Sequence, residues 1–315
     1  MKNPVELTTG ENDRGRRLDR VLRKALPEYP LPLIHRLLRQ GRVLVDGKSA
    51  NAQDRLESGS RISIPALELS PCGLSGIARK DIPIPADKPS PRKQAVPLPV
   101  ILWQGQGLLA VYKPAGLAVH GAKSLDEMVR AFLAGKLPPS LSFRPGPLHR
   151  LDKPSSGIVV FSTSIEGARL FTGLMRAREV RKTYLAILNG KIDREEVWED
   201  YLSRDTKKKK TFVWDEQNSG GKNAITKIVP LAAEGDYSLV MAEIATGRTH
   251  QIRSQAAAHG HPLAGDRKYG GHGADCFFLH AWKLEFQDTA IEAPLPGAFE
   301  EMIKKLKMRS LFHWP

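Results

Sequence analysis

A proline-rich stretch between Ala66 and Val100 divides the sequence into two parts with different patterning. Seven of the 23 prolines lie in this stretch, in segments such as DIPIPADKPSPRK, and periodic apolar residues stop there. Proline fixes φ and has no backbone N–H, so the stretch predicts an extended linker rather than a helix or a strand. We therefore expect an amino-terminal module over residues 1–65, a linker over residues 66–99 and a large domain over residues 100–315.

The chain carries a large excess of positive charge. Lys and Arg number 48 against 34 Asp and Glu, which gives a formal net charge of +14 over 315 residues. Such an excess is typical of proteins that bind a polyanion, although it also occurs as solubilising surface charge. A hydrophobic content of 41% is enough for a folded core.

Several classes of protein are disfavoured by the sequence. Cys72 and Cys276 are too few for a disulfide framework or a four-thiolate zinc site, and His250, His259 and His261 have no cysteine nearby to complete a metal site. The amino terminus, MKNPVELTTGENDRG, carries acids and no apolar segment, and no run of about 18 apolar residues occurs anywhere. We expect a cytoplasmic protein without a membrane span or a metal.

The amino-terminal module shows helical periodicity followed by a hairpin signal. Apolar residues between Arg16 and Leu26 recur at helical spacing and predict one buried stripe. A second short helix around Ile34 to Leu38 should end at Gly41, which suits a left-handed cap. A strand over residues 43–45 then meets Asp46-Gly47, a dipeptide that favours a tight hairpin turn.

This order over residues 16–65, in RLDRVLRKALP…IHRLLRQGRVLVDGK, resembles the S4 RNA-binding domain. The resemblance implies that basic side chains of the module contact RNA phosphates, which positions an RNA without reading its bases. The side chains concerned are those of Arg16, Arg17, Arg20, Arg23, Lys24, Arg36, Arg39 and Arg42.

The large domain is rich in predicted strands. Candidate strands lie at Leu108 to Tyr112, Gly157 to Thr163, Thr183 to Leu188, Ala224 to Leu231 and Tyr237 to Ile244. One helix should start at Thr163, which forms a capping-box spacing with Glu166, and another should run from about Thr249 to His259. Strands in runs with a few helices predict an α+β domain on a mixed, largely antiparallel sheet.

The segment HRLDKPSSG, residues 149–157, places the carboxylate of Asp152 in a turn before a strand. On its own, an aspartate there caps the turn or pairs with Arg150. The longer segment HRLDKPSSGIVVF resembles the catalytic loop of the RluA-type pseudouridine synthases, in which H-R-L-D is followed two residues later by T-S-G. Ser155 stands where threonine is usual, and it keeps the hydroxyl.

Other segments are similar to the same family in the same order. They are LLAVYKPAGLAVHG (108–121), RKTYLAIL (181–188), TGRTHQIR (246–253), GHPLAGDRKYGG, FLHAWKLEF and EAPLP. The resemblance covers residues 100–296. It implies a pseudouridine synthase fold with a central catalytic cleft.

The resemblance also implies a reaction and roles for residues. Uridine is isomerised to pseudouridine without a cofactor or a metal, and Asp152 is the catalytic group, either as a nucleophile or as the acceptor of a ribose proton. Tyr184 should contact the target base, and Arg253 should pair with Asp152 and stabilise its charge. Supporting roles are expected for Lys113, His149, Arg150, Arg248, His250 and Gln251.

The family resemblance indicates an RNA substrate but not which RNA. Members with an S4 module often act on large-subunit ribosomal RNA, which is the expected target, with transfer RNA as the alternative. A non-catalytic S4 RNA-binding or ribosome-assembly factor is the other class. Hydrolysis of a nucleoside bond is a third, but the sequence shows no second carboxylate at a suitable spacing for it. The run Lys207 to Lys210 is either an RNA contact or a solvated loop. We expect a monomer whose tail, EEMIKKLKMRSLFHWP, forms an amphipathic helix.

Overall fold

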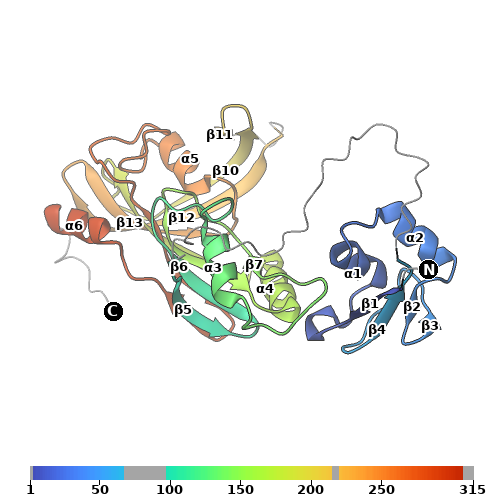
Figure 1. Ribbon diagram of the computed structural model, residues 1–315. Helices are drawn as coiled ribbons and strands as arrows, with labels where there is room; N and C mark the ends of the chain where they lie inside the picture. The colour runs from blue at the N-terminus through green and yellow to red at the C-terminus, as the bar shows by residue number, and fades with distance from the viewer. Residues whose placement is uncertain (1–2, 67–96, 215–219, 308–315) are drawn as a thin grey trace, which may run out of the picture. The chain divides into compact units, whose positions relative to one another are not determined.

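The computed structural model describes residues 3–66, 97–214 and 220–307. They form two compact units, one comprising residues 3–66, 97 and 133–145 and the other residues 98–132, 146–214 and 220–307 (Figure 1). The predicted linker over residues 66–99 lies almost entirely outside the described residues.

The first unit contains two helices and a small sheet. Its elements are β1 (Val5–Thr8), a 3₁₀ turn (Glu11–Asp13), α1 (Leu18–Ala25), α2 (Leu31–Arg39), β2 (Leu44–Val45), β3 (Lys48–Ser49) and β4 (Arg61–Ile64). The strand order is β1-β4-β2-β3, with antiparallel pairs throughout. The predicted left-handed cap and hairpin turn are present, since φ is +67° at Gly41, +49° at Asp46 and +78° at Gly47. The predicted apolar stripes of both helices form the buried core.

Asp13 is the polar centre of this unit. Its buried carboxylate accepts hydrogen bonds from the backbone N–H groups of Gly10 (3.0 Å), Leu141 (2.9 Å) and Ser142 (3.1 Å). The hydroxyls of Ser140 and Ser142 donate to it as well, at 2.8 and 2.5 Å. Burial disfavours the charged form, but these hydrogen bonds, led by that of Ser142, keep the pKa of Asp13 below its ordinary value. Asp13 thus joins residues 140–142 to the amino-terminal module.

The second unit is built on an eleven-stranded sheet. Its main strand order is β11-β10-β12-β13-β9-β14-β8-β6-β5, with β15 on β14 and β7 on β8. Among the described pairs only β14 and β8 run parallel, so the sheet is mixed and largely antiparallel, as predicted. The first elements are β5 (Val100–Gly105), β6 (Leu108–Lys113), α3 (Leu125–Leu133), β7 (Gly146–Pro147), β8 (Ser156–Ser162), α4 (Ile165–Ala177) and β9 (Arg181–Asn189). They continue with β10 (Glu196–Asp205), β11 (Lys210–Trp214), β12 (Lys222–Glu234), β13 (Tyr237–Ile244), α5 (Gln251–Ala258), β14 (Leu279–Phe286), β15 (Thr289–Glu292) and α6 (Gly297–Lys305).

The helix after β8 begins later than the sequence predicts. It starts at Ile165, and its N-cap is Ser164, whose hydroxyl accepts from Gly167 N–H at 3.0 Å. The predicted cap, Thr163, is wrong. The N–H groups of both Thr163 and Ser164 donate to the carbonyl of Gly107, at 2.8 and 3.1 Å, so the contact with the strand edge extends through Ser164 and the helix begins after it. In the tail, α6 is a helix as predicted, whereas residues 308–315 lie outside the described residues.

Helices cover the sheet at separate places. Phe171 and Leu174 of α4 pack on β6, β8 and β14, and Phe299 and Ile303 of α6 pack on β9 and β13. The shorter α5 lies against β10 and β11 (Figure 1). Within the described ranges, no helix combines the length and the apolar character needed to cross a bilayer.

The junction of β8 and β14 requires a glycine. Gly157 has φ of +115°, and a Cβ placed on it would lie 2.2 Å from the carbonyl oxygen of Ala281. A side chain there would therefore separate the two strands. Asp152 precedes this junction by five residues, so the close approach of the backbones sets where its loop enters the sheet.

We predict that Asp13→Asn destabilises the first unit. An amide offers one oxygen where the carboxylate offers two, so at least one buried N–H donor is left without its partner, at a cost of about 1–3 kcal/mol. The pKa of Asp13 is lower in the folded state, so the stabilisation is present above the ordinary value of 3.8 and disappears as the pH falls through the folded-state pKa. Hydrogen exchange of residues 5–64 in the full chain measures this. Glu6→Gln, an exposed change on β1, is the control, and equal protection in both variants would contradict the role of Asp13.

Candidate active site

The loop that carries Asp152 is fixed by its backbone. Ser155 N–H donates to the carbonyl of Asp152 at 3.1 Å, which closes the turn before β8. Lys113, at the end of β6, donates its ammonium to the carbonyls of Lys153 (3.1 Å), Pro114 (3.0 Å) and Leu117 (2.8 Å). Burial lowers the pKa of Lys113 to about 8, against the attraction of Asp152. The predicted support by Lys113 is therefore geometric: it ties the turn after β6 to the loop.

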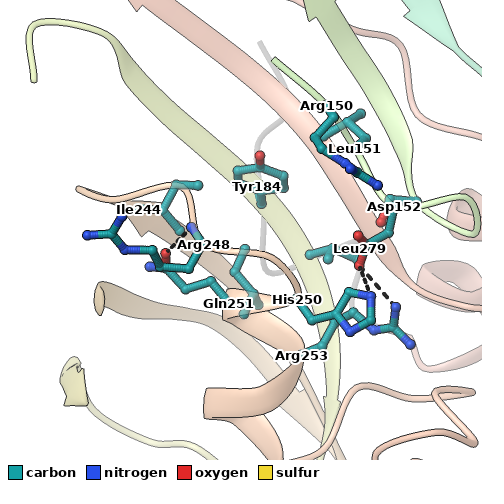
Figure 2. A pocket seen from close by; sticks show the side chains of 12 residues that line it. Arg150, Leu151, Asp152, Tyr184, Ile244, Arg248, His250, Gln251, Arg253 and Leu279 are labelled. Atoms are coloured by element: carbon teal, nitrogen blue, oxygen red, sulfur yellow. Dashed lines mark hydrogen bonds and ion pairs between the residues drawn. The ribbon is translucent and has the colours of Figure 1, made fainter. Parts of the chain in front are cut away.

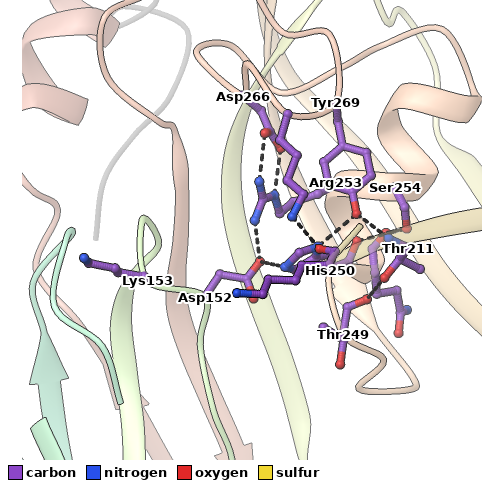
Figure 3. A network of polar contacts seen from close by, with 12 residues as sticks. Asp152, Lys153, Thr211, Thr249, His250, Arg253, Ser254, Asp266 and Tyr269 are labelled. Carbon is purple, nitrogen blue, oxygen red and sulfur yellow. Dashed lines mark hydrogen bonds and ion pairs between the residues drawn. The ribbon is translucent and has the colours of Figure 1, made fainter. Parts of the chain in front are cut away.

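Arg253 connects Asp152 to a second carboxylate. Its Nη1 donates to Oδ2 of Asp152 at 3.0 Å, while Nε and Nη2 donate to the two oxygens of Asp266 at 2.7 and 2.8 Å (Figure 3). Its guanidinium carbon also lies 5.1 and 5.0 Å from the ring centroids of Tyr269 and Phe277. Burial opposes the charge of Arg253, but the hydrogen bonds and charges of Asp266 and then Asp152 raise its pKa. The guanidinium is permanently charged and fixed in orientation.

His250 approaches the same oxygen of Asp152. Its Nε2 lies 3.8 Å from Oδ2, and its Nδ1 is 2.8 Å from the hydroxyl of Tyr269, which also accepts Thr211 N–H at 2.8 Å. Burial lowers the pKa of His250, against the attraction of Asp152, so the ring is neutral near pH 7. Burial also raises the pKa of Tyr269, so its phenol keeps its proton near neutral pH. In the tautomer in which this phenol donates to Nδ1, the imidazole N–H lies at Nε2, on the side of Asp152.

The pocket in front of Asp152 is shown in Figure 2. Tyr184, from β9, lies between Asp152 on one side and Ile244 and Arg248 on the other. The full lining is Arg150, Leu151, Asp152, Ser155, Tyr184, Ile244, Arg248, His250, Gln251, Ile252, Arg253 and Leu279. Burial, with the charge of Asp152 adding to it, raises the pKa of Tyr184, so this phenol is a hydrogen-bond donor at neutral pH. An aromatic ring and a carboxylate thus share one small hollow.

Gln251 fixes the segment that closes this pocket. Its amide nitrogen donates to the carbonyl of Ile225 (3.0 Å) and to the hydroxyl of Thr226 (2.9 Å), both on β12. Its oxygen accepts from the Thr246 hydroxyl (2.7 Å) and from Arg248 N–H (3.0 Å). Gln251 therefore contributes mainly by holding residues 246–251 against the sheet, which leaves the Arg248 side chain exposed at the pocket rim.

Seven of the nine predicted site residues line the pocket, and two do not. Lys113 lies at the end of β6, where its ammonium binds the carbonyl of Lys153 in the loop that carries Asp152. His149 accepts Val160 N–H through Nε2 at 3.1 Å and stacks on Phe171, so its ring faces the core near α4. Burial, with the charge of Lys182, lowers the pKa of His149 to about 4, which agrees with a neutral, accepting ring.

The residues missed by sequence reasoning are Asp266 and Tyr269. Both belong to GHPLAGDRKYGG, a segment that resembles the family without indicating a role for any one of its residues. The sequence feature that could have indicated them is the presence of one acidic and one aromatic residue in a glycine-rich loop after α5. The three histidines weighed as a metal cluster have separate partners: Tyr269 for His250, Asp200 for His259 and the carbonyl of Asn189 for His261.

Comparisons with known proteins identify the family of this chain. The family of RNA pseudouridylate synthases matches residues 107–258, and the S4 domain matches residues 16–62. The ribosomal large subunit pseudouridine synthase C of Vibrio vulnificus is 30% identical, over 98% of this chain and 98% of its own length. This chain belongs to the RluA-type RNA pseudouridine synthases.

Other relatives extend the comparison. The ribosomal large subunit pseudouridine synthase D of Neisseria meningitidis is 28% identical, over 98% of this chain and 83% of its own length. The solved structure of human RNA pseudouridylate synthase domain containing 4 shares the fold, with a TM-score of 0.54, 23% identity and coverage of 66% of this chain and 93% of its own. The synthase is thus an isomerase that acts on RNA.

The basic side chains of the S4 module gather in one hollow. It is lined by Arg16, Arg17, Asp19, Arg20, Arg23, Lys24, Leu31 and His35. Arg17 is neutralised by Asp19, with an N–O distance of 2.7 Å, and Arg16 donates to the Ser142 hydroxyl at 2.8 Å. Partial burial and the positive charges of Arg16 and other nearby arginines lower the pKa of Lys24. The electrostatic potential in this hollow is therefore positive. Of the other predicted RNA contacts, Arg39 lines a second hollow, and Arg36 and Arg42 are exposed.

We predict that Asp266→Asn lowers the rate of the synthase while leaving its fold intact. The substitution keeps the shape but removes the charge and one acceptor for Arg253, which frees the guanidinium to shift away from Asp152. We expect kcat to fall by about 10–100-fold, which is about 1.4–2.8 kcal/mol, with a smaller change in KM. Single-turnover kinetics measure this, with exposed Asp288→Asn as the matched control. Wild-type kcat in Asp266→Asn would contradict the proposed dependence of Asp152 on Arg253.

Proposed function

We propose that this synthase isomerises uridines of large-subunit ribosomal RNA and that Asp152 is its catalytic residue. The observation that carries the proposal is the single carboxylate that faces the pocket and is held by Arg253. The named relatives that match nearly the whole chain act on large-subunit ribosomal RNA, and the S4 module offers a basic surface for it. Transfer RNA is the alternative substrate.

The contacts of Asp152 leave one oxygen for the substrate. Arg253 and His250 both approach Oδ2, and no hydrogen bond to Oδ1 occurs within the described part of the chain. Oδ1 is therefore the atom that attacks or accepts a proton. Both routes need the ionised carboxylate, and Arg253 pairs with it at an N–O distance of 3.0 Å.

The reaction conserves all heavy atoms of the nucleotide. The bond between ribose C1′ and N1 breaks, the uracil turns within the site, and C1′ forms a bond to C5. C5 then loses its hydrogen as a proton and N1 gains one, so no oxidant or reductant is consumed. One carboxylate suffices because the base stays in the pocket, whereas a glycosidase needs a second one to activate water.

Tyr184 is suited to hold the base. Its ring stands beside Asp152 in the pocket, and its raised pKa prevents it from acting as a base near neutrality. A paired target must leave its stack to reach this ring, at a cost of a few kcal/mol. Contact with the aromatic face recovers about 1–3 kcal/mol of that cost.

Asp152→Ala provides the decisive test of the catalytic role. The assay follows tritium released from C5-labelled uridine in large-subunit ribosomal RNA and, in parallel, in transfer RNA, both prepared from cells that lack this enzyme. We expect wild-type release from the ribosomal RNA and none from the variant, because no other lining carboxylate among the described residues can replace Asp152. Release from transfer RNA alone would reject the ribosomal target. Retained RNA binding without release by the wild type would instead favour an assembly factor.

Tyr184→Phe separates stacking from hydrogen bonding. We expect Tyr184→Phe to retain activity within about tenfold, because the ring remains, and Tyr184→Ala to lose at least 100-fold, about 2.7 kcal/mol. The measurement is kcat from tritium release at pH 6 to 9. A flat ratio of wild type to Tyr184→Phe across this range is expected since the phenol stays protonated. A ratio that changes with pH would contradict that protonation state.

A further inference from the structure

A second hollow of the synthase unit lies directly beside the base pocket. Its lining consists of Leu202, Ser203, Arg204, Thr211, Gly220, Lys222, Gly247, Arg248 and Thr249. Arg248 belongs to the lining of both the base pocket and this hollow. We call the second hollow the flanking groove. The two hollows therefore meet at Arg248.

The cations of the flanking groove are exposed and are not neutralised by carboxylates. Arg204 donates to the Thr249 hydroxyl at 3.4 Å, and Arg248 donates to the carbonyl of Asn223 at 3.1 Å, so both have neutral partners. Within the described residues, neither these arginines nor Lys222 lies within 4.0 Å of a carboxylate oxygen. Three cations without carboxylate partners, placed beside hydroxyl groups, are the set with which proteins contact phosphate oxygens.

The wall of the flanking groove is fixed to the catalytic centre. Arg204 and Thr211 face each other across the β10–β11 hairpin, on the side of α5. Thr211 donates its N–H to the hydroxyl of Tyr269 at 2.8 Å and its own hydroxyl to the carbonyl of Thr249 at 2.9 Å (Figure 3). The hairpin is therefore held by the same tyrosine that binds His250.

The lysine run of the sequence forms the tip of this hairpin. Lys210 Nζ lies 5.0 Å from the ring centroid of Tyr269, and Lys268 donates to the carbonyl of Lys209. Slight burial and the charges of Arg253 and Arg204 lower the pKa of Lys268, which shows that positive charge accumulates here. The exposed Lys207 and Lys208 extend this positive edge away from the pocket.

We propose that the flanking groove binds the sugar-phosphate backbone of the nucleotide next to the target uridine, with Arg204 and Lys222 as phosphate contacts. This rests on the proposed function, because it presumes that the target base occupies the pocket. Phosphate contacts in the groove fix the register of the bound RNA strand. Arg248 lies between the groove and the base pocket, where the sugar-phosphate backbone and the target base take different directions. The groove thus contributes to substrate affinity rather than to the chemical step.

The test uses Arg204→Gln, Lys222→Gln and the double variant in the full chain. The matched control is Lys304→Gln, which removes an exposed positive charge from α6. The side chains of Arg204, Lys222 and Lys304 are all exposed, so thermal unfolding should match that of the wild type. Binding to an unmodified large-subunit ribosomal RNA transcript is measured between 50 and 300 mM salt on the inactive Asp152→Ala background, so it does not depend on turnover. Over this roughly sixfold range of salt concentration, the contribution of phosphate contacts to the affinity for RNA changes strongly.

We expect the slope of log K against log salt to fall by about 0.7 for each phosphate of a single strand that a variant no longer neutralises. In tritium release, with Asp152 restored, KM should rise several-fold more than kcat falls. An unchanged slope, or an equally large effect of Lys304→Gln, would overturn the proposal. If the wild type releases no tritium but the slope still falls by this amount, phosphate binding by the groove is retained. The ribosomal-RNA isomerase proposal then fails, and with it the assignment of the bound nucleotide as the neighbour of a target uridine.

Discussion

The pairing of one buried guanidinium with two carboxylates determines the geometry of the candidate active site. Arg253 comes from α5, Asp152 from the loop before β8 and Asp266 from the loop after α5. Burying an arginine is costly unless its donors are satisfied, and here Asp266 takes two of them in a planar, bidentate contact. Nη1 of the same guanidinium is thereby directed at Oδ2 of Asp152. The acid is presented by a group that cannot rotate, so its other oxygen keeps a fixed position in the pocket.

The helix that supplies Arg253 is held by polar contacts more than by an apolar stripe. Gln255, fully buried, donates to Asp200 at 2.7 Å and accepts from the Thr226 hydroxyl at 2.7 Å, and Gln251 is bound to the same strand, β12. Each of these buried amides would be destabilising if left unsatisfied. Because hydrogen bonds are directional where apolar contacts are not, this packing fixes the rotation of α5 about its axis. Arg253 therefore faces Asp152.

Much of this arrangement could be predicted from the sequence, and the failures have physical causes. Strands with continuous apolar runs, such as β6 and β9, and the S4 helices have clear patterns. By contrast, the apolar pattern does not predict β10. Its inward positions are Trp198, Asp200 and Leu202, so an acid interrupts the apolar alternation. This buried acid pairs with Gln255 and His259. The role of Asp266 depends on an approach to Arg253 in space that spacing alone does not reveal. Likewise, the helix is capped one residue later than the capping box at Thr163 predicts, because the N–H groups of both Thr163 and Ser164 donate to the carbonyl of Gly107, a contact visible only once the sheet is formed.

In the proposed reaction, the positive charges of the chain and the carboxylate of Asp152 have separate roles: the charges bind RNA, and the carboxylate reacts with the nucleotide. Cations placed beside Asp152 would attract phosphate to the reacting centre, but the cation nearest it, Arg253, is already occupied by two carboxylates. The groove cations Arg204, Lys222 and Arg248 lie outside the base pocket or on its rim. Residues 246–251 border both sites and are held to β12 by Gln251, so the two sites keep a constant separation. A backbone bound in the groove would therefore place the neighbouring base at a defined depth beside Oδ1 of Asp152.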